Sequence, residues 1–360
     1  ELVKYFQKIG MQFGPDANAH TGFYETVYDI NLPTSNRQSL QEALQVMQDY
    51  AEGALLLPSQ IERERGVILA EKRTRDSADY RAYVASLKFE LAGTLFPDRL
   101  PIGTEDVIRS ADQSVFKRFY DTWYRPDNMV LVMVGDFDPA LAQSLVETQF
   151  SKMVARHQPD SEQLFVGKVR HEGLKTFYHH EEELGSSSVT LQVLDHYPPQ
   201  PDNADYRRQK IEEQLANQIL RNRLNRKVNL ADSPITDASA GSGVFLRQTR
   251  YGYISSDCQP GDWQDALALI EQTLRQALDY GFNEDELERV KKDYRAGLSQ
   301  AVAQAKTRES GTLARQLIRA VSGDKVFRSP AQEEQFAVPI VEAVTASAVS
   351  YTHLTLPTNA

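Results

Sequence analysis

Only one cysteine, Cys258, occurs among the 360 residues of the sequence. A single cysteine excludes an internal disulfide and any zinc module that is built from several cysteines. Long hydrophobic runs are also lacking. The longest strongly apolar run, Met129 to Val134, is far shorter than the ~18 residues that a membrane-spanning helix needs. We therefore expect no transmembrane segment in this chain.

A surplus of positive charge is absent as well. Lys and Arg number 40 against 50 Asp and Glu, which gives a formal net charge of -10 and an isoelectric point near 5.3. Binding to a nucleic-acid duplex relies on clustered Lys and Arg that contact the phosphates. The charge therefore argues against nucleic acid as a partner.

The short motifs of several common enzyme classes are missing too. The sequence contains no phosphate-binding loop, no dinucleotide fingerprint, no HExxH and no GxSxG. The densest histidine cluster is His179 and His180, followed by three glutamates. Adjacent residues of a strand point to opposite faces of a sheet, so this cluster is a poor metal site. We expect it to be a solvated strand end.

Composition and length predict a globular chain of two domains, and the order of its predicted strands and helices gives the α+β class. Hydrophobic residues make up 41% of a chain that is too long for one ordinary α/β domain and about right for two. We expect two homologous layered domains, each a mainly antiparallel sheet packed against helices. Residues 1–160 would form an N-terminal domain whose start is missing, residues 155–163 would contain a polar linker, and residues 165–349 would form the second domain.

Periodicity places the elements within these domains. Alternation of polar and apolar residues indicates strands, and an apolar repeat of three to four residues indicates helices. In the first half these patterns predict strands at 23–32 and 129–134, the second as a buried central strand, and helices at 37–52, 59–75, 82–92, 112–124 and 138–152. In the second half they predict strands at 175–180, 188–194, 236–245 and 251–258, and helices at 206–228, 263–280, 284–306 and 312–321. Asn283 and Glu286 predict a capping box at the start of one of these helices.

Both ends of the chain have unusual features. The first ten residues have the pattern of a helix that ends at Gly10, with neither an initiator methionine nor a signal peptide. We expect Glu1 to be an internal position of a longer gene product. Residues 350–360 resemble a translated cloning scar, so we expect them to be a non-native tail.

The predicted helix at 59–75 carries two glutamates in a suggestive position. At about 100° per residue, Glu64 and Glu71 are nearly eclipsed, and both fall between Val67 and Ile68 on the apolar arc. A carboxylate that points to the core needs a compensating cation or metal. The pair therefore fits a metal ligand and its supporting acid.

An ordinary salt-bridged helix explains the same pattern. Arg65 and Lys72 fall on the same arc as the two glutamates. Ion pairs between residues three or four positions apart are common on amphipathic helices. Helical geometry alone leaves both interpretations open.

Three ordered segments resemble the insulinase/pitrilysin family of zinc peptidases. They are the run from Gly14 to Pro33, the segment from Glu64 to Glu71 and the run from Trp123 to Asp136. The resemblance extends over residues 1 to about 349 and is strongest in the first 140 residues. The joint order of the three segments makes it fairly specific.

The resemblance implies zinc-dependent hydrolysis of peptide bonds. In the family, an HxxEH motif supplies two histidine ligands and the catalytic glutamate, and a distant glutamate supplies the third zinc ligand. Glu71 corresponds to that third ligand, and Glu64 corresponds to its supporting acid. Three protein ligands leave one coordination position open, as in catalytic zinc sites generally. The cofactor implied for the full-length protein is Zn²⁺.

A peptide-binding strand is implied as well. Family enzymes add the substrate as an extra strand, which would place Asn18, Ala19 and Thr21 beside the scissile bond. Without the family pattern, Asn18 is equally explained as a residue that closes a turn. The expected partners are a peptide substrate and either the C-terminal half of the same protein or a partner subunit that completes the reaction chamber.

One departure from the family pattern changes the expectation for this chain. No HxxEH occurs in the sequence, and a single carboxylate does not meet the coordination number of zinc. We therefore expect the full-length protein to be a zinc metalloendopeptidase of peptides or small proteins, and the chain as given to be inactive and without bound Zn²⁺.

A non-catalytic family member is the alternative. Such a protein would act as a scaffold or binding subunit of a peptidase complex. Retention of both Glu64 and Glu71 favours a catalytic parent. Relatives with this loop pattern are often exported from Gram-negative bacteria, which favours the periplasm over the cytoplasm as the compartment.

Overall fold

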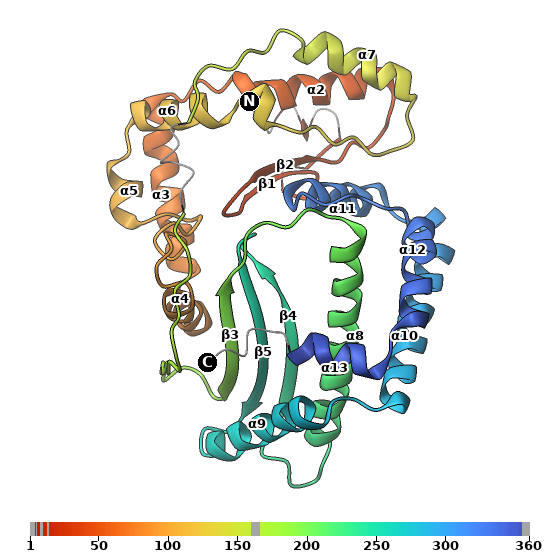
Figure 1. Cartoon of the computed structure of the whole chain (residues 1–360). Helices are drawn as coiled ribbons and strands as arrows, with labels where there is room; N and C mark the ends of the chain where they lie inside the picture. The colour runs from red at the N-terminus through yellow and green to blue at the C-terminus, as the bar shows by residue number, and fades with distance from the viewer. Residues whose placement is uncertain (1–3, 5, 8–9, 13, 160–165, 355–360) are drawn as a thin grey trace. The chain divides into compact units, whose positions relative to one another are not determined.

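Figure 1 shows the computed structural model of the chain, which describes residues 4, 6–7, 10–12, 14–159 and 166–354, with side chains up to residue 350. The described strands are β1 (Ala17–Thr21), β2 (Thr26–Ile30), β3 (Ser187–His196), β4 (Asp237–Phe245) and β5 (Thr249–Cys258). The described α-helices are α2 (Arg37–Glu52), α3 (Pro58–Thr74), α4 (Ala78–Glu90), α5 (Glu105–Ser110), α6 (Gln113–Trp123), α7 (Pro139–Phe150), α8 (Ala204–Val228), α9 (Trp263–Tyr280), α10 (Glu284–Ala303), α11 (Ser310–Ser322), α12 (Pro330–Ala343) and α13 (Ala346–Leu354).

Contacts divide the chain into two compact units whose sequence segments are interleaved. Unit 1 consists of residues 1–76, 95–166 and 309–322, and unit 2 consists of residues 77–94, 167–308 and 323–360. Helix α4 therefore belongs to unit 2 although it directly follows α3 of unit 1. Helix α11 belongs to unit 1 although both of its sequence neighbours belong to unit 2. The linker predicted around residues 155–163 falls partly on residues 160–165, which lie outside the described part of the chain.

Unit 1 is built around a two-stranded antiparallel ribbon of β1 and β2. Its pairing places Ala17 opposite Ile30 and Thr21 opposite Thr26. One end of the ribbon packs on α2 through an apolar cluster. The buried members of that cluster are Phe6, Met11, Ala17 and Val46.

The apolar run at 129–134 differs from the predicted central strand. Met133 packs against the apolar cluster that joins α2 to α7, whereas Val130 and Leu131 are exposed. A strand requires a neighbour that pairs with its backbone groups. Within the described residues, no strand pairs with this run. For the same reason the strand predicted at 175–180 is not formed there.

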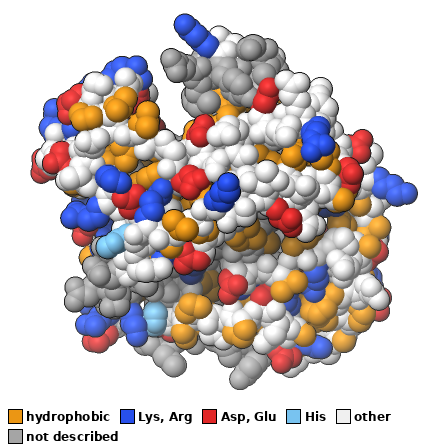
Figure 2. Space-filling model, turned by 90° about the horizontal axis from the view of Figure 1, so that it is seen from above, with side chains coloured by type: hydrophobic (Ala, Val, Ile, Leu, Met, Phe, Trp, Pro, Cys, Tyr) orange, Lys and Arg blue, Asp and Glu red, His pale blue; other side chains and the backbone are white. Residues whose placement is uncertain are grey.

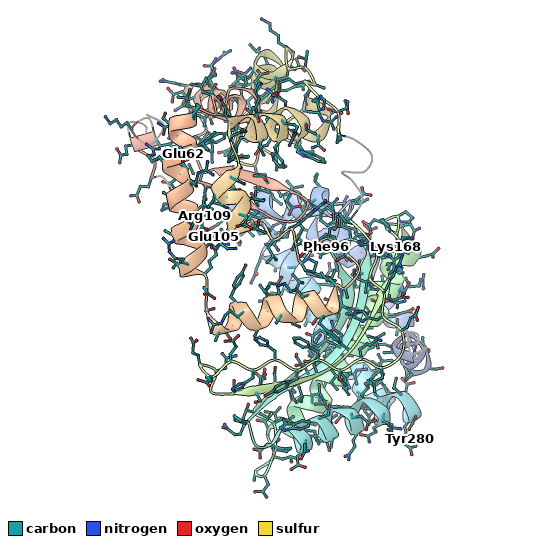
Figure 3. The ribbon with its side chains drawn as sticks, turned by 90° about the vertical axis from the view of Figure 1, so that its left-hand side faces the viewer. Glu62, Phe96, Glu105, Arg109, Lys168 and Tyr280 are labelled. Atoms are coloured by element: carbon teal, nitrogen blue, oxygen red, sulfur yellow. The ribbon has the colours of Figure 1, made fainter. Side chains whose placement is uncertain are left out.

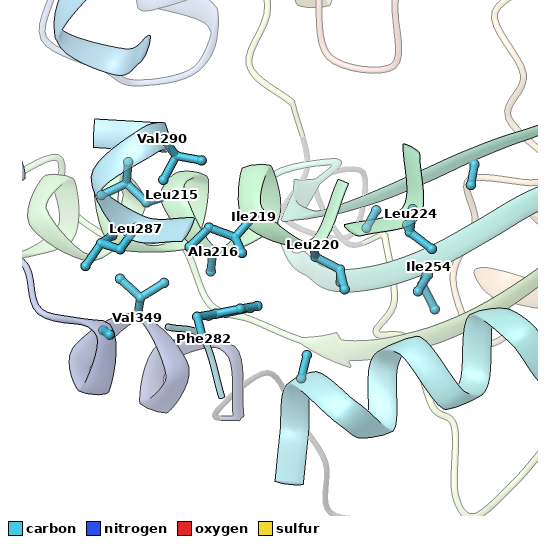
Figure 4. Packing of buried hydrophobic residues seen from close by; sticks show 14 of the residues in the cluster. Leu215, Ala216, Ile219, Leu220, Leu224, Ile254, Phe282, Leu287, Val290 and Val349 are labelled. Carbon is cyan, nitrogen blue, oxygen red and sulfur yellow. The ribbon is translucent and has the colours of Figure 1, made fainter. Parts of the chain in front are cut away.

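Unit 2 is an antiparallel sheet packed against helices, in the strand order β3-β5-β4. Leu191 of β3 and Ala240 of β4 both lie opposite Ile254 of the central strand. Side chains on this face join a large apolar core that includes α8, α9, α10, α12 and α13. Figure 4 shows this packing around Leu220, Leu224 and Ile254. The predicted α+β class is confirmed by this arrangement.

Two glycines allow the chain to cross itself beyond the end of α4. Gly93 and Gly167 have φ angles of +88° and +82°, a region that glycine adopts at little cost. A Cβ atom at Gly93 would lie 2.8 Å from the carbonyl oxygen of Lys168. Thr94 forms an antiparallel bridge with Gly167 at this crossing. The close approach therefore requires residues without side chains.

Acidic and basic side chains are interspersed in the view of Figure 2. The net charge of -10 is thus not gathered into one patch on the face shown. In the described residues, no helix combines the length and the apolar character needed to cross a membrane. Helix α13 extends to Leu354 and so includes the first residues of the tail that was predicted to be non-native, while residues 355–360 lie outside the described part.

Glu286 connects the start of α10 to α8. Arg223 donates from Nε and Nη2 to the two carboxylate oxygens at 2.9 and 2.7 Å, and Arg226 donates at 3.1 Å. The backbone N–H of Asn283 adds a bond at 3.2 Å, so the predicted capping box is confirmed. The hydrogen bonds from Arg223 are the main reason that the pKa of Glu286 is lowered from 4.5 to about 2.

This contact predicts a loss of stability in acid. The folded-state pKa lies below the unfolded value, so the contribution of Glu286 is fully present above about pH 4.5 and disappears as the pH falls toward about 2. We expect a loss of about 1–2 kcal/mol in the free energy of unfolding of unit 2, because solvent screens the partly exposed pair. Urea unfolding at about pH 6 and about pH 3 measures this change in the free energy of unfolding.

Two variants make the acid measurement specific. Glu286→Gln should reduce the difference between the free energies of unfolding measured at the two pH values, because the amide does not titrate. Glu284→Gln, in the same helical turn, is the control for the interaction of a carboxylate with the helix dipole and should leave the difference close to that of the wild type. An unchanged pH difference in Glu286→Gln would contradict the prediction.

Candidate functional site

Helix α3 carries the two candidate metal-site glutamates. Pro58 occupies its first turn, where a missing backbone N–H costs nothing. Lys72 and Arg73 lie in its last turn, where positive charge interacts favourably with the helix dipole. The helix predicted at 59–75 is therefore confirmed to within one residue at each end.

The inner face of α3 is anchored by cations as well as by an apolar side chain. Leu69 is buried. The Arg65 side chain is only 14% exposed and donates to two carbonyls at the end of α5, one of them that of Ala111 at 2.9 Å. Lys72 donates from Nζ to the carbonyl of Gly103 at 2.9 Å. These bonds hold α3 beside α5 (Figure 3).

Glu64 and Glu71 lie on the outer face of α3, which corrects the prediction that they point to the core. Their side chains are 54% and 41% exposed, and Val67 between them is exposed as well. The sequence-based prediction counted Val67 as a buried residue. It therefore placed the buried face of the helix on the side that carries the two glutamates. The inner positions belong instead to Arg65 and Lys72, which donate to backbone carbonyls. Arg65 also pairs with Glu62 at 2.7 Å.

Each glutamate has an arginine partner on the same helix or at its end. Arg75 Nη2 lies 2.5 Å from Glu71 Oε1, and Arg63 Nη2 lies 3.0 Å from Glu64 Oε1. Exposed ion pairs of this kind contribute little to stability. A carboxylate in such a pair can exchange its partner for another cation without disturbing the helix.

Strand β1 contains the candidate substrate-binding residues Asn18, Ala19 and Thr21. The bonds from Asn31 N to Asp16 O (2.7 Å) and from Gly22 N to Glu25 O (2.8 Å) fix its register with β2. In that register, alternate residues of β1 exchange hydrogen bonds with β2. The backbone groups of Ala17, Ala19 and Thr21 therefore point to the edge of β1 that faces away from β2.

The outer edge of β1 is therefore formed by the backbone of Ala17, Ala19 and Thr21. Within the described residues, β1 pairs with β2 alone. The Ala17 carbonyl accepts from Gly14 at 2.9 Å, and the Asn18 side-chain oxygen accepts from the Ala19 N–H at 2.8 Å. Asn18 thus satisfies a backbone donor of the edge, and Ala19 and Thr21 present the groups to which an added strand would bind.

The histidine cluster forms a polar network. His179 Nε2 lies 2.8 Å from Glu181 Oε1. Arg81 of α4 binds Glu181 at 2.9 Å and Glu183 at 2.6 Å. These contacts attach the segment to α4. Across the described residues, no group of three or more His, Cys, Asp or Glu side chains is placed to hold a metal ion.

Comparison with known families identifies the chain. Residues 1–88 match the profile described as insulinase, peptidase family M16, and residues 110–294 match the profile described as the peptidase M16 inactive domain. The second match covers more than half of the chain. The chain therefore belongs to the M16 insulinase family of peptidases.

Individual relatives agree with this assignment. The probable zinc protease PqqL of Escherichia coli K12 is 26% identical over 97% of this chain and 37% of its own length. The probable zinc protease PqqL of Haemophilus influenzae is 36% identical over 42% of this chain and 16% of its own length. This chain thus spans well under half the length of these relatives.

Solved structures show the same fold. The crystal structure of the first half of the periplasmic protease PqqL from Escherichia coli superimposes with a TM-score of 0.86 at 25% identity. The match covers 99% of this chain and 75% of that structure. The ferredoxin protease FusC, in a complex with Arabidopsis ferredoxin, has a TM-score of 0.81 at 22% identity and covers 97% of this chain and 38% of that one.

Proposed function

We propose that this chain is part of the first half of a zinc-dependent metalloendopeptidase that hydrolyses peptides or small proteins. Membership of the M16 family supports the activity class. The observation that carries the assignment of the site is the outer face of α3, where Glu71 and Glu64 lie two turns apart and are both accessible. In this proposal Glu71 is a metal ligand and Glu64 supports it.

The donor groups of the described residues fit one side of a zinc site. A glutamate oxygen is an ordinary zinc ligand, but a catalytic site needs three protein ligands. The two further ligands and the catalytic base of an HxxEH motif would come from outside these 360 residues. A bound zinc ion would supply Lewis-acid activation of water and of the scissile carbonyl. Glu71 would orient that ion against α3, which Arg65 and Lys72 hold in place.

The outer edge of β1 fits an extended peptide. The backbone groups of Ala19 and Thr21 point to that edge, and Asn18 would release the Ala19 N–H when a substrate strand binds. Addition of a strand gives affinity through main-chain hydrogen bonds, which do not depend on sequence. Asn18, Ala19 and Thr21 are therefore the proposed substrate-binding residues.

The remaining residues have proposed roles as well. Residues 1–160 would form the peptidase domain and residues 165–349 a homologous, inactive-type domain; the description of the second matching profile supports an inactive-type domain, although its match at residues 110–294 begins before residue 160. The rest of the same protein or a partner subunit would complete the chamber. The periplasm is the proposed compartment, because a similar protein of Escherichia coli is described as periplasmic. The relative that was solved with ferredoxin supports small proteins as a substrate class.

A non-catalytic binding subunit is the second candidate. One observation favours it, namely that Glu71 is already paired with Arg75 at 2.5 Å. In a scaffold this pair would persist. In an active peptidase the carboxylate would turn from the arginine to the metal.

Metal content tests the proposal directly. The full-length protein should bind about one zinc per chain and lose peptide cleavage on treatment with a chelator. The 360-residue chain alone should retain less than about 0.1 zinc per chain, because one carboxylate does not complete a site. Plasma emission spectrometry after dialysis measures both values.

Each sample can contradict a different part of the proposal. Near-stoichiometric zinc in the 360-residue chain would refute the assignment of the missing ligands to residues outside it. A full-length protein that binds no zinc and cleaves no peptide would establish the scaffold instead.

A further inference from the structure

Tyr28 of β2 belongs to a cluster of four tyrosines in unit 1. Its hydroxyl oxygen lies 2.6 Å from that of Tyr124, just after α6, and its ring stacks on Tyr50 of α2 with centroids 4.8 Å apart. The Tyr120 ring lies 4.6 Å from the Tyr124 ring. The Tyr120 hydroxyl donates to the Tyr50 carbonyl at 2.8 Å. The cluster therefore joins β2 to two helices that are distant in sequence.

Arg156 fixes the far side of this cluster. Its guanidinium lies 4.6 Å from the centre of the Tyr120 ring. It donates to the Tyr124 carbonyl at 3.0 Å and pairs with Asp121 at 3.0 Å. Burial, followed by the hydrogen bond with Tyr124, raises the pKa of Tyr28 well above its usual value. The phenol thus stays neutral and hydrogen-bonded throughout the physiological pH range.

Tyr28 lies directly opposite Ala19 in the β ribbon. The register makes this a pair without mutual hydrogen bonds, in which the two Cα atoms are only about 4.5 Å apart and the side chains share a face. Ala19 is also the residue whose backbone N–H points to the outer edge of β1. A two-stranded ribbon is only marginally stable by itself. The position of the Ala19 backbone therefore depends on the contacts that hold β2.

We propose that Tyr28 is a positioning residue for the peptide substrate. Its hydrogen bond to Tyr124 and its stacking on Tyr50 hold β2 against α2 and α6, and the close pairing with Ala19 transmits that position to the edge of β1. Tyr28 acts through Ala19 and does not itself contact the peptide. This inference rests on the proposed function, in which the edge of β1 receives the substrate.

The test uses steady-state cleavage of an extended peptide by the full-length protein. Tyr28→Phe removes the hydrogen bond and keeps the stacking, so KM should rise about three- to tenfold while kcat changes less than about twofold. Tyr28→Leu removes both contacts and should raise KM further. Tyr124→Phe breaks the same hydrogen bond from the other side, so its effect should match that of Tyr28→Phe, and the double variant should add little.

Tyr294→Phe is the matched control. Tyr294 is a partly buried tyrosine of unit 2 whose hydroxyl donates to Gln214 at 3.3 Å. The same loss of one hydroxyl there should leave KM unchanged. A KM for Tyr28→Phe equal to that of the control would overturn the proposal, as would a fall in kcat that merely parallels a loss of thermal stability.

Hydrogen exchange separates this inference from the proposed function. In the 360-residue chain, Tyr28→Phe should increase exchange at the amides of Asn18 and His20, the β1 residues that are hydrogen-bonded to β2, by about three- to tenfold relative to Tyr294→Phe. This measurement needs no enzymatic activity. If the wild-type full-length protein cleaves no peptide, the proposed function fails, and the exchange data still decide whether Tyr28 fixes β1. Unchanged exchange at β1 would overturn the positioning role.

Discussion

Replacing Glu71 by Gln in the full-length protein is expected to lower kcat/KM for peptide cleavage by more than about a hundredfold. Loss of a residue that only supports a metal ligand typically costs about 10- to 100-fold, so loss of a ligand should exceed that range. Glu64→Gln should fall within it. Gln keeps the shape of the side chain but is a much weaker zinc ligand. The bound zinc, measured in the same samples, should fall together with the activity of Glu71→Gln.

Glu271→Gln in α9 is the matched control for this substitution. Glu271 is paired with Arg275 four residues further along its helix, and its side chain is 38% exposed, close to the 41% of Glu71. The control repeats the loss of an exposed helical ion pair outside the candidate site. It should leave zinc content and kcat/KM unchanged. Full zinc content and full activity in Glu71→Gln would remove Glu71 from the metal site.

Leu224→Ala should destabilise unit 2 by about 3–5 kcal/mol. Leu224 has no exposed surface and lies in the core between α8 and the sheet (Figure 4). Removing three carbon atoms there loses their transfer free energy and leaves a cavity that the packed helices fill only partly. Urea unfolding followed by tryptophan fluorescence measures the change in the free energy of unfolding.

The distribution of tryptophans makes this measurement specific for unit 2. The chain has two tryptophans, Trp123 in unit 1 and Trp263 in unit 2. A Trp123→Phe background leaves Trp263 as the reporter of unit 2. Leu230→Ala, just beyond the same helix and exposed, should change stability by less than about 0.5 kcal/mol. Similar midpoints for the two leucine variants would contradict the position of Leu224 in the core.

Most of the longer helices could be predicted because their signals are local, whereas the short helices α5 and α13 were not predicted. Asn283 and Glu286 predict the start of α10 by the bonds that each makes to the other's backbone. Strands depend on partners elsewhere in the chain. The run at 129–134 is as apolar as a central strand, yet no described strand pairs with it. Periodicity did not predict strand β1, because ANAHT is short and its alternating apolar residues are only alanines.

The orientation of the candidate site residues could not be predicted from the sequence. Glu71 and Glu64 were identified by their spacing and by the family resemblance, but the direction of α3 depends on distant carbonyls. Arg65 and Lys72 turn inward because the chain near Ala111 and Gly103 supplies acceptors for them. The periodicity argument placed these two cations on the same arc as the glutamates and did not determine which pair faces the core. The tyrosine cluster around Tyr28 could not be predicted from local patterns either, because its members come from β2, from α2 and from the C-terminal end of α6.

The interleaving of the two units has a consequence for any cut in the chain. A protease that cleaved between residues 160 and 165 would leave α4 on the first fragment, although α4 is part of the unit formed mainly by the second. The second fragment would in turn retain α11, which belongs to the unit formed mainly by the first. Each piece would thus keep a helix of the other's fold. Each unit would therefore keep all of its segments only while the two fragments remained together.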